Sequence, residues 1–400
     1  MKAAVRSGQA VRGIFGATPI ARIPSLDLVW GTVPEYMHCV LEGVIKQLTE
    51  AWMTSTYSAY YIGTSLASID DRLVRITPPP IMFSRNPRGL KERALWKAKE
   101  WRYWLLYYAL PCLVGILPRQ YYAHLSLLCQ AIFLLLQKRV SHSDIRVAED
   151  VLKRFLCQVA PLYGESAETS NMHLLMHLPK CVTHLGPLWA TSMFPFESAN
   201  GTVLHFITAY KGAAKQVAER WIMRQSLLFS STKISLPHHL DVIFRMFLRG
   251  TSSRTNGTLG NAQDVRFTAA QQNVLSAYFS HVPAFQMYHR ARILGLDVQC
   301  AAYQRCKRTC TRFIKTKDGA FCEVLYILKT VADGNIFLLS KKLITDGCLG
   351  STTYVHKCII PPQDENLRVL PSCDMESVCV CVKVTRDVYL CDMPNFYEKE

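Results

Sequence analysis

A polar segment at residues 249–264, "RGTSSRTNGTLGNAQD", separates two parts of the chain with different patterns of apolar residues. The segment is rich in Gly, Ser, Thr and Asn and has no apolar periodicity, so we predict a flexible linker over 249–267. Before it, apolar residues recur at the three- and four-residue steps of helices. After it, short β-rich runs alternate with turn signals. The sequence therefore predicts a mainly α chain with a small β domain at its C-terminal end.

The helical part is predicted from several amphipathic segments. Between Tyr36 and Trp52, one helical face collects the side chains of Met37, Val40, Leu41, Val44, Ile45 and Leu48. Further helices are expected near residues 90–109, 120–137, 143–160, 169–185, 211–230 and 268–279. The "SHSD" cluster at 141–144 is a good N-cap for the segment that follows it. Residues 1–30 are short apolar pieces broken by Gly and Pro, which are typical of strand or loop.

The C-terminal part is predicted to be β-rich from about residue 284 onward. The turn signals "KDG" and "ADGN" separate short β-rich runs, and "ESVCVCVKVTRDVYLC" alternates in the same way. We expect an antiparallel barrel or sandwich that is appended to the helical body. Cys379 and Cys381 alternate on one strand and would share its buried face, as small apolar residues do.

The charge balance favours a polyanionic partner. The 400 residues include 46 Lys and Arg against 30 Asp and Glu, which gives a net charge of +16 and a pI near 9.2. Such an excess suits nucleic acid ahead of a membrane surface, although an ordinary basic protein stays open as the alternative.

Two basic stretches are candidates for contact with nucleic acid. In the first, "YQRCKRTCTRFIKTK", aromatic rings interleave with Arg305, Lys307, Arg308, Arg312, Lys315 and Lys317. In the second, at 85–102, Arg93 and Lys97 lie among seven basic residues, interleaved with Trp96, Trp101 and Trp104. Cations and rings in this mixture can hold phosphates and stack on bases. A solvated helix face explains the pattern equally well.

The 15 cysteines and the apolar runs indicate the cellular compartment in which the protein is expected. The N-terminal residues have no apolar core long enough for a signal peptide. The longest apolar run, "LSLLCQAIFLLLQ" at 125–137, is too short to span a bilayer. We therefore expect an intracellular protein with reduced thiols and no membrane partner.

One carboxylate–imidazole pair has the spacing of a functional site. In "PEYMHCVLEGV", Glu35 and His38 are three residues apart and share a helical face, where they could hold a metal or relay a proton. The alternative is a helix N-terminus, with Pro34 in the first turn, Glu35 favouring the helix dipole and His38 packed near Trp52.

Two further sets of side chains have weaker metal-ligand patterns. His173 and His177 lie four residues apart, with His184 two turns further on, but the Glu of an H-E-x-x-H site is absent, so we favour a structural or interface role. The second set is Cys300, Cys306, Cys310 and Cys322, whose spacing contains no C-x-x-C pair. Zinc binding by these thiols is only weakly indicated.

Taken in order, several blocks resemble the C-terminal part of CACTA-type (En/Spm-like) transposases. The most specific are "EYMHCVLEGV" and "GPLWATSMFPFESANG". Softer matches are "VRGIFGATPIARIPSLDLVWG", "KAKEWRYWLLYYALPCLVGILPRQYYAHLSLL", "HLLMHLPKCVTHL" and "YLCDMPNFYEKE". The resemblance implies a ribonuclease H-like catalytic domain with a large helical insertion. In that domain, three carboxylates hold two Mg²⁺ ions for phosphodiester chemistry.

The resemblance also implies a division of the chain. Residues 1–52 would be a partial ribonuclease H-like core remnant, 53–190 the helical insertion and 191–248 the helices that return to the core. The linker at 249–267 and a C-terminal helix with the small β domain at 268–400 would follow. By position, Glu197 in "FPFESANG" fits the third carboxylate, and Glu35 to His38 fit a "[C/D]-x-x-H" signature whose first residue here is Glu.

The resemblance also implies what the chain lacks. Only 34 residues precede "EYMH", and Asp27 is the one Asp among them, so the first two carboxylates of the catalytic set are missing. We therefore expect a catalytically inactive, transposase-derived, nuclear DNA-binding protein with a vestigial Glu197 close to His38. No metal is expected in this chain, whereas the intact parent enzyme would use Mg²⁺. A protein-interaction or homo-oligomerisation module, or a fragment of an active enzyme, stays open.

Overall fold

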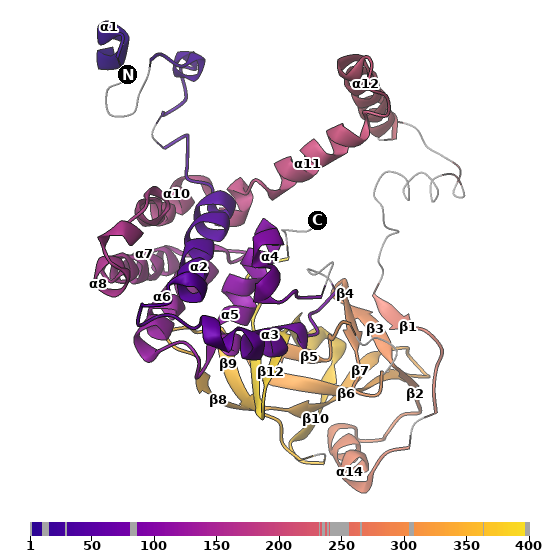
Figure 1. Ribbon diagram of the computed structural model, residues 1–400. Coiled ribbons are helices and arrows are strands. Elements are labelled where there is room, and N and C mark those ends of the chain that lie inside the picture. Colours follow the sequence, from indigo (N-terminus) through magenta and orange to yellow (C-terminus); the bar gives the residue numbers. More distant parts are fainter. Residues whose placement is uncertain are drawn as a thin grey trace.

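The computed structural model describes residues 2–9, 16–28, 30–80, 86–231, 233, 237, 240, 256–264, 266–303, 308–362 and 364–396. Within them the chain is helical as far as Ser231, and antiparallel strands appear from Gly257 onward (Figure 1). The prediction of a mainly α chain with a C-terminal β region is confirmed at this level.

The helical part consists of α-helices together with 3₁₀ and π turns labelled η, of which η2 and η5 are π-helical. They are α1 (Lys2–Ser7), η1 (Pro19–Arg22), η2 (Met37–Ile45), α2 (Lys46–Thr54), η3 (Gly63–Ser65), α3 (Leu66–Val74), η4 (Leu90–Leu95), α4 (Ala98–Tyr103), η5 (Trp104–Tyr108), α5 (Ala109–Leu113), α6 (Arg119–Leu135), α7 (His142–Cys157), α8 (Val159–Tyr163), η6 (Glu165–Ala167), α9 (Ser170–Leu174), η7 (Leu175–His177), α10 (Leu178–Leu185), η8 (Leu188–Thr191), α11 (Phe194–His205) and α12 (Ala213–Ser231).

The C-terminal part consists of short strands with one helix and one 3₁₀ turn. They are β1 (Gly257–Leu259), α14 (Ala269–Tyr278), β2 (Phe285–Tyr288), β3 (Arg290–Ile293), β4 (Leu296–Gln299), β5 (Phe313–Thr316), β6 (Phe321–Thr330), β7 (Ile336–Lys342), β8 (Ile344–Cys348), β9 (Val355–Ile359), β10 (Leu367–Pro371), η9 (Ser372–Asp374), β11 (Met375–Val378), β12 (Val380–Val384) and β13 (Asp387–Cys391).

Helix α7 shows how local sequence sets an element boundary. Ser141 Oγ accepts from the backbone N–H of Asp144 at 3.1 Å, and the Asp144 carboxylate accepts from the N–H of Ser141 at 2.9 Å. This reciprocal capping box satisfies two N–H groups that would otherwise lack partners. The helix start predicted from "SHSD" is confirmed.

Other helix predictions were wrong in their boundaries. The helix expected over 90–109 is interrupted, because Trp96 and Lys97 have extended backbone between η4 and α4. The helix expected over 169–185 is divided by η7, and Pro179 begins its second part. "FPFESANG" lies outside the predicted helices, yet it begins α11, with Pro195 in the first turn.

The described residues of the N-terminal segment contain none of the strands that were considered for it. Its described residues form α1, the short turn η1 and loop, and no residue described before Gly257 belongs to a strand. The described residues of 1–52 therefore show no sheet. The expected ribonuclease H-like remnant stays a prediction that the fold does not support.

The strands form three antiparallel sheets. The first has the order β1-β3-β4 and the second β10-β7-β6-β5-β11, with β2 also paired to β6; the third has the order β12-β13-β9-β8. Gly319 and Gly334 take positive φ values of 81° and 72° in the turns predicted from "KDG" and "ADGN". Strand β1 lies inside the predicted linker and pairs with β3, so that part of the linker prediction was wrong. Residues 249–255 lie outside the described residues.

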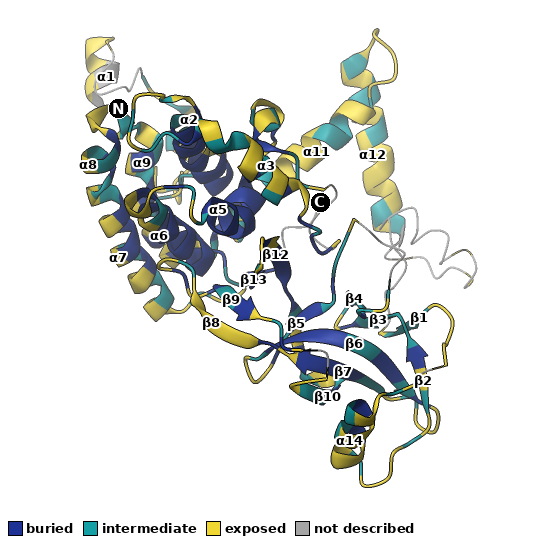
Figure 2. Cartoon of the chain, turned by 60° about the horizontal axis from the view of Figure 1, so that its bottom comes forward, coloured by how far each residue is buried: buried dark blue, intermediate teal, exposed yellow. Residues whose placement is uncertain are grey.

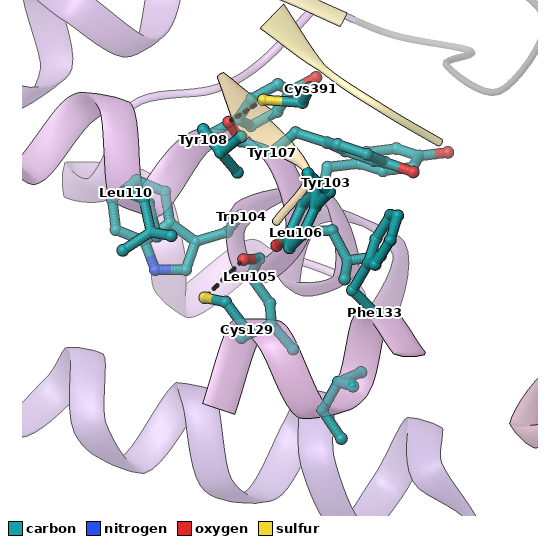
Figure 3. Packing of buried hydrophobic residues seen from close by; sticks show 14 of the residues in the cluster. Tyr103, Trp104, Leu105, Leu106, Tyr107, Tyr108, Leu110, Cys129, Phe133 and Cys391 are labelled. Carbon is teal, nitrogen blue, oxygen red and sulfur yellow. Dashed lines mark hydrogen bonds between the residues drawn. The ribbon is translucent and has the colours of Figure 1, made fainter. Parts of the chain in front are cut away.

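The β region is not an appended domain, because one apolar core runs through both parts of the chain. The Cys391 thiol in β13 donates to the carbonyl oxygen of Tyr107 in η5 at 3.6 Å (Figure 3). The ring of Phe133 in α6 lies flat on Tyr354 with centroids 3.9 Å apart. We refer to these packed residues of η5, α5, α6 and the third sheet as the junction.

Hydrogen bonds also connect the helical and C-terminal parts of the chain at the junction. The Gln130 side chain in α6 accepts from the backbone N–H of Thr353 at 2.8 Å and donates to its hydroxyl at 3.0 Å. Asn395 donates to the carbonyl of Leu136 at 2.7 Å. The strands that were expected to form an appended barrel or sandwich therefore share one apolar core with the helices, which cover one face of the third sheet.

Helices α11 and α12 form an arm that extends away from the body (Figure 1). Phe206 meets Trp221 edge to face with ring centroids 6.5 Å apart, and Arg220 donates to the Thr208 hydroxyl at 2.8 Å. No residue of α11 is buried, and the described side chains of α12 are exposed or half-buried (Figure 2). Among the described residues, no helix has both the length and the apolar character needed to cross a membrane.

Candidate functional site

Glu35, His38 and Glu197 meet where η2 and α11 begin. His38 Nδ1 lies 2.9 Å from Glu35 Oε2, and His38 Nε2 lies 3.6 Å from Glu197 Oε1. The imidazole therefore lies between two carboxylates from distant parts of the chain. The expected closeness of Glu197 to His38 is confirmed; the catalytic ancestry of the three residues stays a prediction.

Glu35 positions this cluster through its hydrogen bonds. Its Oε1 accepts from the N–H of Met37 at 2.9 Å and from the N–H of Met193 at 3.0 Å. Its Oε2 accepts from the N–H of His38 at 3.0 Å. The carboxylate thus caps η2 and also holds the chain just before α11, which places Glu197 in the first turn of that helix. The helix-cap interpretation of Glu35 is confirmed by these bonds, whereas a metal or proton-relay role for Glu35 stays a prediction.

Aromatic packing fixes the same corner. The rings of Tyr36 and Phe194 meet edge to face at 6.3 Å, and the Arg102 guanidinium lies 5.6 Å from the Phe194 ring centroid. His38 does not pack on Trp52 as the alternative suggested, since Trp52 is buried and donates to the Tyr163 hydroxyl at 3.4 Å. The His38 and Glu197 side chains are each 54% exposed, so solvent and solutes reach them.

The cluster has too few available carboxylate oxygens for two Mg²⁺ ions. Both oxygens of Glu35 accept from backbone N–H groups, and Glu197 is the one other carboxylate that pairs with His38 in the described part of the chain. The Asp27 side chain accepts from the N–H of Trp30 at 3.0 Å, in a turn. Across the described residues, no group of three or more His, Cys, Asp or Glu side chains is arranged to hold a metal.

A cavity of about 270 Å³ opens beside Glu197. Lys97, Lys99, Trp96 and Tyr103 contribute to its wall, together with the Arg88–Glu100 ion pair, whose closest atoms are 2.6 Å apart. Lys97 is exposed. An anionic or ring-bearing ligand could therefore meet a cation and aromatic rings within one opening.

Many cations predicted to contact nucleic acid are paired inside the protein. Arg93 lies 2.9 Å from Glu50, Arg312 lies 3.1 Å from Glu323, and Lys315 lies 2.7 Å from Asp392. These side chains are partly buried, where a charge requires a partner. Lys97, Arg308 and Lys317 are exposed and stay candidates; Arg305 and Lys307 lie outside the described residues.

The interleaved aromatic rings were misinterpreted. Trp101, Trp104 and Phe313 are each at most 1% exposed, because they fill the core rather than the surface. Trp104 donates from its indole N–H to the Thr49 hydroxyl at 3.1 Å. These rings cannot stack on bases without unfolding the core, so that part of the prediction was wrong.

The histidine set packs around one indole. His173 and His177 approach with their Nε2 atoms 3.3 Å apart, and His184 stacks on Trp30 at 5.8 Å between ring centroids. Lys180 Nζ lies 3.8 Å from the same ring centroid. Burial and the neighbouring cations lower the pKa of His177. This agrees with the favoured structural interpretation.

The cysteine set is largely buried. Burial raises the pKa of Cys322 to about 11 and also raises the pKa values of Cys300 and Cys310, which disfavours the thiolates that zinc requires. Cys306 lies outside the described residues.

Comparisons with protein-family models, with curated proteins and with solved structures find no match for this chain.

Proposed function

We propose that this chain is a transposase-derived, nuclear DNA-binding protein that does not itself cut DNA. The observation that carries the proposal is the meeting of Glu197 with Glu35 and His38 beside an open cavity with Lys97 in its wall. The resemblance of "EYMH" and "FPFESANG" to two transposase blocks supports the same origin.

The net charge of +16 supports DNA as the partner. Each internal ion pair neutralises one positive and one negative charge, so ion pairing leaves the excess of positive charge unchanged. The surplus therefore lies on side chains without an acidic counterpart, and it attracts a polyanion at long range. The structure changes which cations are candidates for contact with DNA: Lys97 is preferred over Arg93.

The carboxylates are the reason for proposing that this chain does not cut DNA. Two-metal phosphodiester chemistry needs oxygens that bridge and orient both ions. Glu35 uses its oxygens on backbone N–H groups and on His38, so the residues present do not fit two Mg²⁺ ions. No catalytic step is assigned to these residues.

DNA binding is tested by fluorescence anisotropy with a labelled duplex over a series of salt concentrations. We expect affinity to fall steeply with salt, and Lys97→Ala to reduce the log–log slope by about one. Lys153→Ala is the matched control, since Lys153 is exposed on α7 and paired with Glu149 at 2.8 Å. Absence of binding at low salt would contradict the proposal.

Cleavage is tested by incubating supercoiled DNA with Mg²⁺ and the full chain, beside Glu197→Gln. We expect the wild-type protein and the variant to leave the DNA intact. Nicking by the wild-type protein that disappears in Glu197→Gln would show an active enzyme and overturn this part of the proposal.

A second candidate function is self-association through the α11–α12 arm. Ile222, Met223 and Phe229 on α12 are 62%, 70% and 62% exposed. A two-helix hairpin cannot cover its own apolar side chains, whereas two hairpins can pack together as a four-helix bundle. We therefore infer that the arm of a second copy of this chain covers these side chains. Light scattering of Ile222→Glu against Val147→Glu, an exposed position on α7, tests it. Equal masses for both variants and the wild type would remove this candidate.

A further inference from the structure

A second constellation of functional side chains lies in the third sheet. Cys348 Sγ lies 3.4 Å from His356 Nδ1, and His356 Nε2 lies 3.8 Å from Asp392 Oδ2. Asp392 in turn accepts from Lys315 Nζ at 2.7 Å. A thiol, an imidazole and a carboxylate thus follow one another in a row that begins at an exposed cysteine.

Three neighbouring strands build this row. Cys348 ends β8 and lies opposite His356 of β9, after a register shift between Thr345 and Cys348 that turns the thiol toward the ring. On its other side β9 pairs with β13, and Asp392 directly follows β13. The backbone N–H of Asp392 donates to the carbonyl of Tyr354 at 3.0 Å, which continues the ladder and fixes the carboxylate.

The surroundings hold the imidazole in one orientation. The Phe321 ring lies 4.6 Å from the His356 ring, and Asp392 is only 9% exposed. Asp392 Oδ1 and His356 Nε2 are both buried without a hydrogen-bond partner, and the Asp392 carboxylate is the acidic group that Nε2 faces, at 3.8 Å from Oδ2. With Nε2–H facing Asp392, the lone pair of Nδ1 faces the thiol, as a general base for a nucleophile requires.

We propose that Cys348 is a nucleophilic thiol, with His356 as its base and Asp392 as the group that orients the imidazole, and that it exchanges with small disulfides. The Cys348 sulfur attacks one sulfur of R–S–S–R while its proton passes to His356 Nδ1. A new S–S bond joins Cys348 to one R–S group, the old S–S bond breaks, and the leaving R–S⁻ takes the proton. The small disulfide is the oxidant: the Cys348 sulfur is oxidised to the mixed disulfide, and one R–S group is reduced to R–SH.

The local backbone favours a disulfide over an acyl substrate. Acyl transfer needs N–H donors aimed at a developing oxyanion. The N–H of Leu349 already donates to Val355 at 2.9 Å, and the N–H of Ser351 donates to the Ser126 hydroxyl at 2.9 Å. Disulfide exchange needs no oxyanion site, only a deprotonated thiol that a small reagent can reach.

Two other exposed cysteines provide an internal comparison. Cys157 and Cys373 are free and exposed, and Cys373 Sγ lies 3.8 Å from the carboxylate of Asp374. Burial and the charge of Asp392 raise the pKa of Cys348 above its ordinary value. Without help from His356, Cys348 would therefore be no more reactive than Cys157.

The titratable groups beside the His356 ring are Cys348 from β8 and Asp392 after β13, and Asp392 is itself paired with Lys315 from β5. On the same strand, the Cys358 thiol donates to the backbone carbonyl of His356 at 3.8 Å. Burial raises the pKa of Cys358 to about 12, so this second thiol stays protonated and does not compete for the reagent.

The test uses the full chain with oxidised glutathione, followed by acid quenching and peptide mapping by mass spectrometry. We expect Cys348 to form the mixed disulfide at least about tenfold faster than Cys157 and Cys373 at neutral pH. In His356→Gln, Cys348 should fall to the rate of the other two cysteines or below, and its pH–rate profile should move to higher pH. His142→Gln, an exposed histidine of α7, should leave all three rates unchanged.

The test stays decisive even if a variant folds poorly, because the rate of Cys348 is compared with the rates of Cys157 and Cys373 in the same wild-type molecule. If Cys348 reacts no faster than Cys157 in the wild type, the proposal is wrong. It is equally wrong if a folded His356→Gln, with an unchanged circular dichroism spectrum, keeps the wild-type rate at Cys348.

Discussion

The junction and the α11–α12 arm use similar side chains in opposite surroundings. Trp104 at the junction is completely buried, whereas Trp221 on the arm is 39% exposed. The junction is covered by helices and by the third sheet, whereas in the described part of the arm the body is contacted by the start of α11, at Phe194 and Glu197. Residue type alone therefore does not decide burial; the number of neighbouring elements does.

The two regions also differ in how they satisfy polar groups. At the junction, Gln130 and Asn395 bond backbone groups of distant segments. On the arm, Gln216 bonds the nearby loop at Thr208, Ala209 and Lys211. We therefore expect the junction to unfold as one cooperative unit because its bonds are long-range, and the arm to open separately because its bonds are local. The following variants compare matched residues in the two regions.

The largest difference is expected for tryptophan. Trp104→Ala removes a completely buried indole and leaves the Thr49 hydroxyl without its donor, so we expect a loss of about 3–5 kcal/mol in the free energy of unfolding. Trp221→Ala on the arm should cost about 1 kcal/mol or less. Urea unfolding followed by circular dichroism measures both. Equal losses would show that the arm is part of the same core.

Glutamine gives the next comparison. Gln130→Ala removes a side chain that is only 4% exposed together with its two bonds to Thr353, with an expected cost of about 1–3 kcal/mol. Gln225→Ala on the exposed face of α12 should change stability by less than about 0.5 kcal/mol. A negligible effect of Gln130→Ala, measured in the same unfolding assay, would mean that water replaces the side chain at the junction.

Histidine gives a pH-dependent comparison. His124 in α6 donates from Nε2 to the carbonyl of Phe155 at 2.9 Å, while its Nδ1 is buried without a partner, and burial lowers its pKa to about 4. The unfolded chain takes up this proton near pH 6.5, so stability is full above that pH and declines as the pH falls toward 4. Between pH 7 and pH 5 this single group should cost about 2 kcal/mol.

The control for this pH effect is on the arm. His124→Gln should flatten the stability profile between pH 7 and pH 5, whereas His205→Gln on α11 should leave it unchanged. Unfolding midpoints in urea at the two pH values measure the difference. A wild-type slope that persists in His124→Gln would assign the pH dependence to another group.

The smallest effect is expected for methionine on the arm. Met223→Ser changes an exposed side chain and should alter the free energy of unfolding by less than about 0.5 kcal/mol. Met172→Ser, at a position within α9 that is only 1% exposed, should cost about 2 kcal/mol or more. If Met223→Ser destabilises the protein in a manner that depends on its concentration, the arm is buried between copies.

Some parts of the candidate site could be predicted from the sequence and others could not. The spacing of Glu35 and His38 indicated that they share one face, and their atoms lie 2.9 Å apart. The closeness of Glu197 was expected from the order of the blocks and not from any spacing. The bond from the N–H of Met193 to Glu35 was missed, because a backbone donor 158 residues away leaves no trace in residue type.

The basic stretches show the opposite outcome. The run from Arg305 to Lys317 looked like a free cationic surface, yet Arg312 and Lys315 are paired with Glu323 and Asp392. Those acids lie in other strands, so the local count of charges could not reveal the pairing. The row of Cys348, His356 and Asp392 was missed for the same reason, because three strands bring together residues that form no local motif.

The sequence by itself determined the order of helices and strands, the cap of α7, the turns at Gly319 and Gly334, and the net charge. These features depend on backbone preferences and on residues a few positions apart. Only the tertiary structure decided which tryptophans are buried, which cations stay available, and that the strands share a core with the helices. Burial and pairing depend on contacts between distant segments, and a local pattern does not contain those contacts.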